Sequence, residues 1–355
     1  MDDAALDDLT AILPPMLAGL EALEWAGRHL HPPNLAQVLA AIGSLDGMIA
    51  EALPRLAAWT DDLALVRQAV ETAAIELVRA HARLEAAAGA GDVRLAYRAM
   101  RALPRAQEAL YPLAGGLPPV SRYFLEPACR GDMYLLARLA EGAPREEVGF
   151  LHAENELGTR GGVSLYVPET YDPARPAPLV VALHGGSGHG RDFLWSWVRT
   201  ARSLGAVLIA PTAAGETWAL TGPDLDSPRI AQVVAQVRER WAIDETRLLL
   251  TGMSDGGTFC YVSALDNGSP FTHLAPVSAT FHPMLISMAD AERMQGLPIF
   301  LTHGALDWMF PVEVARQAQR ALSAAGASVT YREIDDLSHT YPREINAPML
   351  EWLKA

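Results

Sequence analysis

The sequence predicts an α/β protein in which a doubly wound, mostly parallel sheet follows an N-terminal all-α helical bundle. Two observations carry this prediction. Up to about Gly142 the chain is rich in Ala and Leu at helical spacing, and beyond it short Val, Leu and Ile runs alternate with helical stretches. We therefore expect a helical domain over residues 1–142 and an α/β domain over residues 143–355, with the boundary at Gly142-Ala143-Pro144.

A long helix is predicted in the middle of the first half, because its apolar residues recur at alternating spacings of three and four. They are Leu63, Val66, Val70, Ala73, Leu77, Ala80 and Leu84. Thr60 is placed to cap the start of this helix, Gly89-Ala90-Gly91 ends it, and Asp92 is placed to cap the next one. Proline pairs are expected to separate the remaining helices, at Pro14-Pro15, Pro32-Pro33 and Pro118-Pro119.

Strands are predicted in the second half where short apolar runs occur. They cover residues 179–183, 206–210, 247–251, 298–302 and 329–334, and residues 147–167 are expected to add an antiparallel hairpin. The first four runs are almost continuously apolar, as strands covered on both faces by helices must be. Helical patterns lie between them, for example over residues 230–241 and 312–325.

Charge and residue usage exclude several functions. The chain has 28 basic and 42 acidic residues, a net charge of −14, which disfavours nucleic acid and anionic lipid surfaces as partners. The only lysine is Lys354, next to the C-terminus. A phosphate-binding lysine of the Walker A type and a Schiff-base lysine are therefore not expected.

Cysteine spacing gives no sign of a metal site or a disulfide framework, because Cys129 and Cys260 are the only two cysteines. Both are expected to be buried free thiols. The N-terminal residues lack the basic and apolar regions of a secretory signal, and no apolar run approaches the length of a membrane span. We therefore expect a cytoplasmic protein without a membrane span.

A nucleophile is predicted at Ser254. The strand ending at Thr251 runs into Gly252-Met253-Ser254-Asp255-Gly256, and an apolar helix follows. This is the GxSxG elbow in its required strand-turn-helix context. The turn forces the serine into a strained backbone conformation, so small residues are needed on either side, and Gly252 and Gly256 provide them.

A serine hydroxyl becomes a useful nucleophile only when a neighbouring imidazole takes its proton. His339 is the best candidate, because it lies on the loop between the last strand and a C-terminal helix over residues 345–353. Asp307 follows the strand 298–302 and is predicted to orient the imidazole. Asp335 and Asp336 remain alternatives for this acid.

The oxyanion that forms during acyl transfer needs backbone N–H donors. We expect them at Asp255, directly after the nucleophile, and at Gly186 in the loop His184-Gly185-Gly186-Ser187-Gly188. The alternative, a glycine-rich phosphate loop, lacks an accompanying lysine and the GxGxxG spacing.

Tryptophans gather in segments expected at the carboxyl edge of the sheet, where such folds bind ligands. Trp218 and Trp308, together with His184, are predicted to contact the substrate. Trp195 and Trp197 are equally compatible with a pocket wall and with helix packing.

These residues together resemble the α/β-hydrolase family, and within it the polyhydroxybutyrate depolymerase and feruloyl esterase-like carboxylesterases. The resemblance covers roughly the last 210 residues. It rests on the His184 loop, the segment Ile243-Asp244-Glu245-Thr246-Arg247, the elbow, His303-Gly304 before Asp307, and His339. It implies a Ser254, Asp307, His339 triad, hydrolysis of small, aryl or hydroxyacyl esters through an acyl-enzyme, and no cofactor or metal.

Two departures weaken the inference about substrate: Asp255 replaces a small or apolar residue, and the helical half has no counterpart in simple members of the family. A serine peptidase of the prolyl-oligopeptidase type, a (lyso)phospholipase or thioesterase, and a non-catalytic binding protein remain alternatives. We expect the helical half to pack on the hydrolase domain and narrow the mouth of its pocket, or to form a homodimer through its helices.

Overall fold

The computed structural model describes residues 3–44, 47–141 and 145–354. It divides into two compact units, residues 1–136 and 137–355. The division falls within helix α8 (Met133–Glu141). The boundary predicted at Gly142-Ala143-Pro144 lies outside the described residues.

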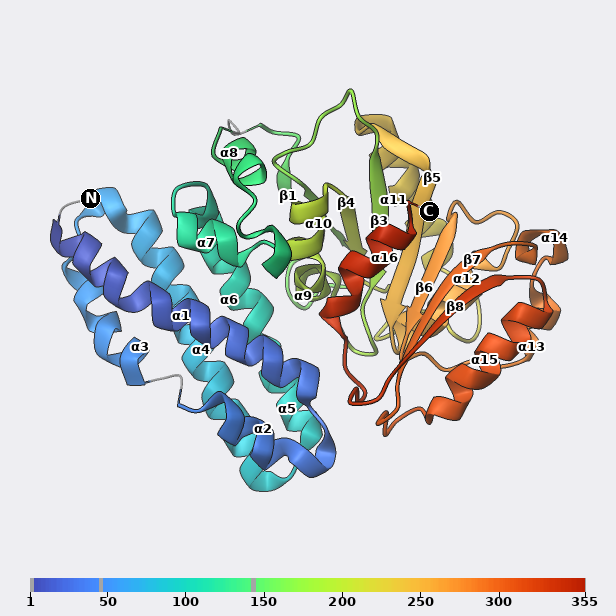
Figure 1. Cartoon of the computed structure of the whole chain (residues 1–355), viewed down its shortest axis with the longest axis horizontal. Coiled ribbons are helices and arrows are strands. Elements are labelled where there is room, and N and C mark those ends of the chain that lie inside the picture. Colours follow the sequence, from blue (N-terminus) through green and yellow to red (C-terminus); the bar gives the residue numbers. More distant parts are fainter. Residues whose placement is uncertain (1–2, 45–46, 142–144, 355) are drawn as a thin grey trace. The chain divides into compact units, whose positions relative to one another are not determined.

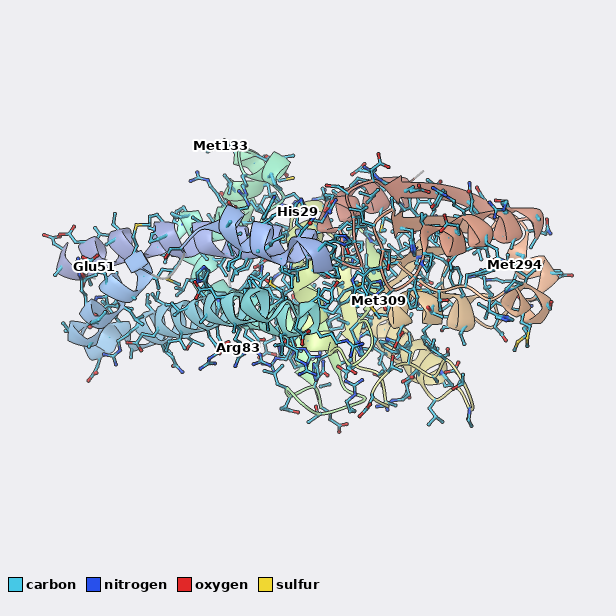
Figure 2. The ribbon with its side chains drawn as sticks, turned by 90° about the horizontal axis from the view of Figure 1, so that it is seen from below. His29, Glu51, Arg83, Met133, Met294 and Met309 are labelled. Carbon is cyan, nitrogen blue, oxygen red and sulfur yellow. The ribbon has the colours of Figure 1, made fainter. Side chains whose placement is uncertain are left out.

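The first unit is helical. Its two long helices are α1 (Asp3–His29) and α4 (Ala64–Ala90). They lie side by side, as Figures 1 and 2 show; in Figure 2, His29 marks the end of α1 and Arg83 a position on α4. The shorter helices are α2 (Leu35–Ile42), α3 (Gly47–Ala52), α5 (Val93–Ala99), α6 (Ala102–Leu110) and α7 (Pro118–Tyr123).

The expectation that Pro14-Pro15 separates two helices is wrong, since α1 continues through both residues. Each proline removes one backbone hydrogen bond from a helix interior. Apolar residues on either side, among them Ile12, Met16 and Leu20, are fully buried, and their packing carries the helix across the break in its hydrogen bonding. Pro32 and Pro118 do lie at the starts of helical segments, as predicted.

The two predicted helix caps differ in outcome. Asp92 caps α5 as expected, because its Oδ1 accepts hydrogen bonds from the N–H groups of Arg94 and Leu95. Thr60 does not cap α4. Its hydroxyl donates to Asp62 Oδ1, and a 3-10 turn over Asp61–Leu63 precedes the helix.

The second unit contains an eight-stranded sheet in the order β1-β2-β4-β3-β5-β6-β7-β8 (Figure 1). The strands are β1 (Gly149–Ala153), β2 (Val163–Val167), β3 (Ala177–Leu183), β4 (Val207–Pro211), β5 (Ile243–Met253), β6 (His273–Val277), β7 (Pro298–Gly304) and β8 (Ser328–Ile334). The β1–β2 and β2–β4 pairs are antiparallel, and the other pairs are parallel. The predicted fold class is confirmed.

Helices cover both faces of this sheet, which explains the continuously apolar strands. In β3, Leu179, Val181 and Leu183 belong to the core beneath α11 (Asp226–Arg240), α12 (Asp255–Ala264) and α15 (Val312–Ala324). The alternate residues Val180 and Ala182 are equally buried on the opposite face. Helices α10 (Val198–Leu204) and α16 (Asn346–Trp352) lie next to each other (Figure 1). The shorter helices are α9 (Gly190–Phe193), α13 (Met284–Met288) and α14 (Ala291–Met294).

Within the described ranges, no single helix has the length and apolar character to cross a membrane, and only the bent pair Pro32–Ile42 and Gly47–Ala58 meets those criteria when taken together. Cys260 is a buried free thiol, as predicted. Cys129 is also free, but it is partly exposed, because it ends a short 3-10 turn instead of facing the core.

Candidate active site

Ser254 lies at a sharp turn between the end of β5 and the start of α12. Its backbone has φ 55° and ψ −119°, a strained conformation for a residue with a side chain. Its backbone is held by hydrogen bonds: its N–H donates to Val277 O at 2.9 Å, and its carbonyl accepts from the N–H and the hydroxyl of Thr258 at 2.8 and 3.1 Å. The turn therefore presents the serine hydroxyl at the carboxyl edge of the sheet.

Glycines make this turn sterically possible. A Cβ on Gly252 would lie 2.5 Å from the carbonyl carbon of Gly256. A Cβ on Gly256 would lie 2.5 Å from the carbonyl oxygens of Leu183 and His184. The elbow is thus packed directly against the loop that follows β3.

Two residues predicted from separate loops meet Ser254. His339 Nε2 lies 3.0 Å from Ser254 Oγ, and His339 Nδ1 lies 2.8 Å from Asp307 Oδ2. Ser254, Asp307 and His339 are all buried. With the proton on Nδ1, the imidazole donates to the carboxylate and accepts from the serine hydroxyl. The alternative acids, Asp335 and Asp336, are exposed.

The Asp307 carboxylate is held on its other side by its own loop. Its Oδ1 accepts hydrogen bonds from the N–H groups of Met309 and Phe310, each at 2.9 Å. Burial by itself raises the pKa of the Asp307 carboxyl, but the hydrogen bond and charge of His339 and the N–H of Phe310 outweigh it, so the pKa lies below its usual value. The carboxylate is therefore kept ionised, which stabilises a positive charge on His339.

A second histidine supports this loop. His303 is fully buried, and its Nε2–H donates to Phe310 O at 2.8 Å while lying 3.5 Å from Asp307 Oδ2. Burial lowers the pKa of His303 below its usual value, against the opposing effects of Phe310 O and Asp307. Because a neutral His303 carries no positive charge, it does not compete with His339 for the interaction with the Asp307 carboxylate.

The predicted oxyanion donors lie beside Ser254. A Cβ on Gly185 would be 3.6 Å from Ser254 Cβ, and one on Gly186 would be 2.6 Å from Asp255 Oδ2, so the loop after β3 passes over the elbow. Within the part of the chain that the structure describes, the N–H groups of Gly186 and Asp255 donate no hydrogen bond. Neither N–H is therefore used in a hydrogen bond within the described residues.

One segment, which we term the clamp (residues 213–218), holds this loop in place. The N–H of Ala213 donates to His184 Nε2 at 3.1 Å, and Glu216 O accepts from the N–H of Ser187 at 3.1 Å. The indole N–H of Trp218 donates to His184 O at 2.7 Å. The clamp therefore positions the oxyanion loop through hydrogen bonds to its first and fourth residues.

Arg160 ties the clamp to the oxyanion loop. Its guanidinium donates to Gly188 O at 2.7 Å, to Gly215 O at 2.6 Å and to Glu216 O at 3.2 Å. Sequence reasoning missed Arg160 and the clamp, since an arginine that binds backbone carbonyls distant in sequence belongs to no local motif.

The residues predicted to bind substrate fall into two groups. His184 and Trp218 are buried, with exposed fractions of 1% and 3%, and their rings lie 4.8 Å apart. They therefore support the oxyanion loop through their own packing and hydrogen bonds, and their direct contact with substrate stays a prediction. Trp308, next to Asp307, is 39% exposed, and its contact with substrate stays a prediction. Trp195 and Trp197 are buried, which favours the packing interpretation.

Among the described residues, no group of three or more His, Cys, Asp or Glu side chains could hold a metal ion. A cavity of about 450 Å³ lies elsewhere, between the β1–β2 hairpin, the end of β4 and α11. Its lining includes Thr212, Trp218, Asp226 and Arg229 but none of Ser254, Asp307 and His339.

Comparisons with known proteins agree with this architecture. Residues 226–355 match the model of the phospholipase/carboxylesterase family. The chain is 28% identical over 158 residues to the bifunctional acetylxylan esterase/xylanase XynS20E of Neocallimastix patriciarum, a match that covers 43% of this chain and 22% of that protein. It is 29% identical over 166 residues to feruloyl esterase C of Emericella nidulans, covering 45% of this chain and 59% of that protein. The chain thus spans less than two thirds of the length of either relative.

Solved structures are similar to more than half of the chain. A thermostable esterase is 23% identical, with a TM-score of 0.48, and the match covers 58% of this chain and 62% of that one. The fluorophosphonate-binding serine hydrolase FphF of Staphylococcus aureus is 16% identical, with a TM-score of 0.48, and the match covers 58% of this chain and 97% of that one. The strand order and the serine elbow give residues 137–355 the α/β-hydrolase fold, and the chain is similar to carboxylic ester hydrolases.

Proposed function

We propose that this protein is a serine hydrolase that cleaves carboxylic esters through an acyl-enzyme, with Ser254 as nucleophile, His339 as general base and Asp307 as the orienting acid. The observation that carries the proposal is the continuous hydrogen-bonded chain from Ser254 Oγ through His339 to Asp307, at 3.0 and 2.8 Å. Free N–H groups of Gly186 and Asp255 beside the nucleophile support it further.

In the acylation step, His339 Nε2 takes the proton of the Ser254 hydroxyl while Oγ attacks the ester carbonyl carbon. The carbonyl oxygen becomes an anion and binds the N–H groups of Gly186 and Asp255. Collapse of this intermediate breaks the bond to the alcohol oxygen, which leaves with the proton from His339. The acyl group then remains on Ser254.

Deacylation repeats these steps with water. His339 removes a proton from the water molecule, whose oxygen attacks the acyl carbon, and the proton then returns to Ser254 Oγ as the acid leaves. In both steps Asp307 stabilises the imidazolium, and Phe310 packs edge-on against the His339 ring at 5.2 Å.

The substrate class we propose is small, aryl or hydroxyacyl esters. The named activities of the two sequence relatives, acetylxylan esterase and feruloyl esterase, support it. The exposed Trp308 and Met309 next to the triad offer apolar surface for an aryl or acyl group. A lysophospholipase activity is the second candidate, because the matching family model is named for phospholipases as well as carboxylesterases.

The test is to treat the full chain with a fluorophosphonate and to assay p-nitrophenyl esters beside lysophosphatidylcholine and aminoacyl-p-nitroanilides. We expect labelling at Ser254 and turnover of the esters, with both lost in Ser254→Ala. Ser278→Ala is the matched control: Ser278 also has a positive φ, of 45°, but its hydroxyl has no hydrogen-bond partner among the described residues. Labelling at another serine, or full activity of Ser254→Ala, would contradict the proposal.

A further inference from the structure

The carboxylate of Asp255 is an unusual neighbour for an oxyanion site. Asp255 is the first residue of α12, directly after Ser254, and its side chain is partly exposed. A Cβ on Gly186 would lie 2.6 Å from Asp255 Oδ2 and 3.3 Å from Asp255 Cγ. The side chain of Asp255 thus lies against the backbone of Gly186, the other proposed oxyanion residue.

Only one oxygen of this carboxylate is used inside the protein. Thr217 Oγ1, in the clamp, donates to Asp255 Oδ2 at 2.6 Å. Over the described residues, Oδ1 accepts no hydrogen bond and no basic side chain pairs with the carboxylate. Thr217 therefore fixes the orientation of the carboxylate and leaves Oδ1 available as an acceptor beside Ser254.

A carboxylate without a basic partner in this place raises the free energy of the oxyanion intermediate, because the two negative charges repel each other. Its favourable interaction with the N-terminus of α12 offsets part of that cost. Over the described residues the Asp255 side chain accepts no backbone N–H of α12, so it does not act as a helix cap.

We propose that Asp255 is a specificity-determining residue that selects esters bearing a hydroxyl or another hydrogen-bond donor close to the scissile carbonyl, and that disfavours anionic esters. The inference rests on the proposed function, since it assigns the substrate class of the same site. A hydroxyl that donates to Oδ1 makes a charge-assisted hydrogen bond, whereas a second anion a few ångströms away is repelled.

The experiment compares kcat/KM for four p-nitrophenyl esters with related acyl chains: butyrate, 3-hydroxybutyrate, 4-(trimethylammonio)butyrate and 4-sulfobutyrate. The wild-type chain is measured beside Asp255→Asn, which keeps the shape and an acceptor for Thr217, and Asp255→Ser, which keeps a small polar side chain at the first residue of α12. Asp244→Asn is the charge control, because Asp244 lies at the other end of β5. Each variant is judged by ratios between substrates, so a general loss of activity does not affect the result.

In the wild-type chain we expect the 3-hydroxy ester to be preferred over butyrate and the sulfonate to be disfavoured. Removing the charge should raise the sulfonate-to-butyrate ratio about ten-fold and lower the 3-hydroxybutyrate and trimethylammonio ratios. Asp244→Asn should leave all ratios unchanged. The inference is overturned if the ratios in both Asp255 variants equal those of the wild type, or if the wild type does not discriminate. Absence of ester turnover and of fluorophosphonate labelling in the wild type would instead contradict the proposed function.

Discussion

Asp307 divides its two carboxylate oxygens between a catalytic partner and its own loop: Oδ2 lies 2.8 Å from His339 Nδ1, and Oδ1 accepts the N–H groups of Met309 and Phe310. Replacement by Asn keeps an acceptor for the loop but presents an amide to the imidazole, which favours the wrong tautomer. We expect Asp307→Asn to fold and to lose about 10⁴-fold in kcat.

Asp335→Asn and Asp336→Asn are the controls for this prediction, because both residues are exposed neighbours of His339 in sequence. Steady-state kinetics on a p-nitrophenyl ester and a thermal melt of each variant make the comparison. If Asp307→Asn keeps the wild-type kcat and one of the controls loses most of its kcat, the residue changed in that control is the orienting acid.

The buried His303 makes stability depend on pH in a defined direction. Burial lowers its folded pKa below the usual value of about 6.5, so between the two pKa values the unfolded chain binds a proton that the folded chain does not. The free energy of unfolding should therefore be highest above pH 6.5 and fall as the pH decreases through that window. One such group contributes a slope of up to about 1.4 kcal/mol per pH unit.

Urea titrations between pH 7.5 and pH 5 measure this slope. His303→Gln retains a donor for Phe310 O but does not titrate, so its slope should be smaller than that of the wild type. His282→Gln, at an exposed position, should have the wild-type slope. Equal slopes in all three proteins would show that His303 titrates alike in the folded and unfolded chain.

Local pattern was enough to predict the parts of the fold whose sequence mirrors their environment. Strand β3, residues 248–250 of β5 and residues 299–301 of β7 are continuously apolar because helices cover both faces of the sheet there. The elbow needs glycine at Gly252 and Gly256 because a Cβ there would meet backbone atoms. The loops after β5, β7 and β8 then bring Ser254, Asp307 and His339 together at one sheet edge. The catalytic roles of these residues stay predictions until they are measured.

Features that depend on contacts distant in sequence could not be predicted. Strand β6 was missed because it is short and contains Pro276, yet it pairs between β5 and β7. Trp218 was expected to contact substrate because of its position after a strand, whereas its indole N–H is used to hold His184 O. The gating or dimerising role of the helical unit and the cytoplasmic location also stay predictions.

Arg160 is predicted to act as a positioning residue for the oxyanion loop. Arg160→Met removes its hydrogen bonds to Gly188 O, Gly215 O and Glu216 O, so the loop should lose its fixed orientation. Loss of a whole oxyanion donor costs about 10²–10³ in kcat, and a loosened donor should cost about ten-fold, with a smaller change in KM.

The effect of Arg160→Met is best separated from a general loss of stability by a trifluoromethyl ketone, which binds as an oxyanion. Its affinity should fall in parallel with kcat. Arg175→Met is the control, because the Arg175 side chain is 70% exposed and pairs with Asp172. If the melting temperature changes but kcat and ketone affinity do not, Arg160 stabilises the fold without positioning the oxyanion loop for catalysis.

Because the elbow packs against the loop after β3, we expect alanine to destabilise the folded chain strongly at Gly256 and little at Gly185. A Cβ on Gly256 would lie 2.5 Å from the carbonyl oxygens of Leu183 and His184, which are backbone atoms that cannot move alone, whereas one on Gly185 would find its nearest atoms at 3.6 Å. Gly256→Ala should therefore destabilise the folded chain by about 3 kcal/mol or more, while Gly185→Ala should leave the melting temperature nearly unchanged. Thermal melts and the yield of soluble protein measure both variants under identical conditions. Equal stability of the two would mean that the elbow can separate from the β3 loop, and the close contact that places Ser254 next to Gly185 would then not be required by the fold.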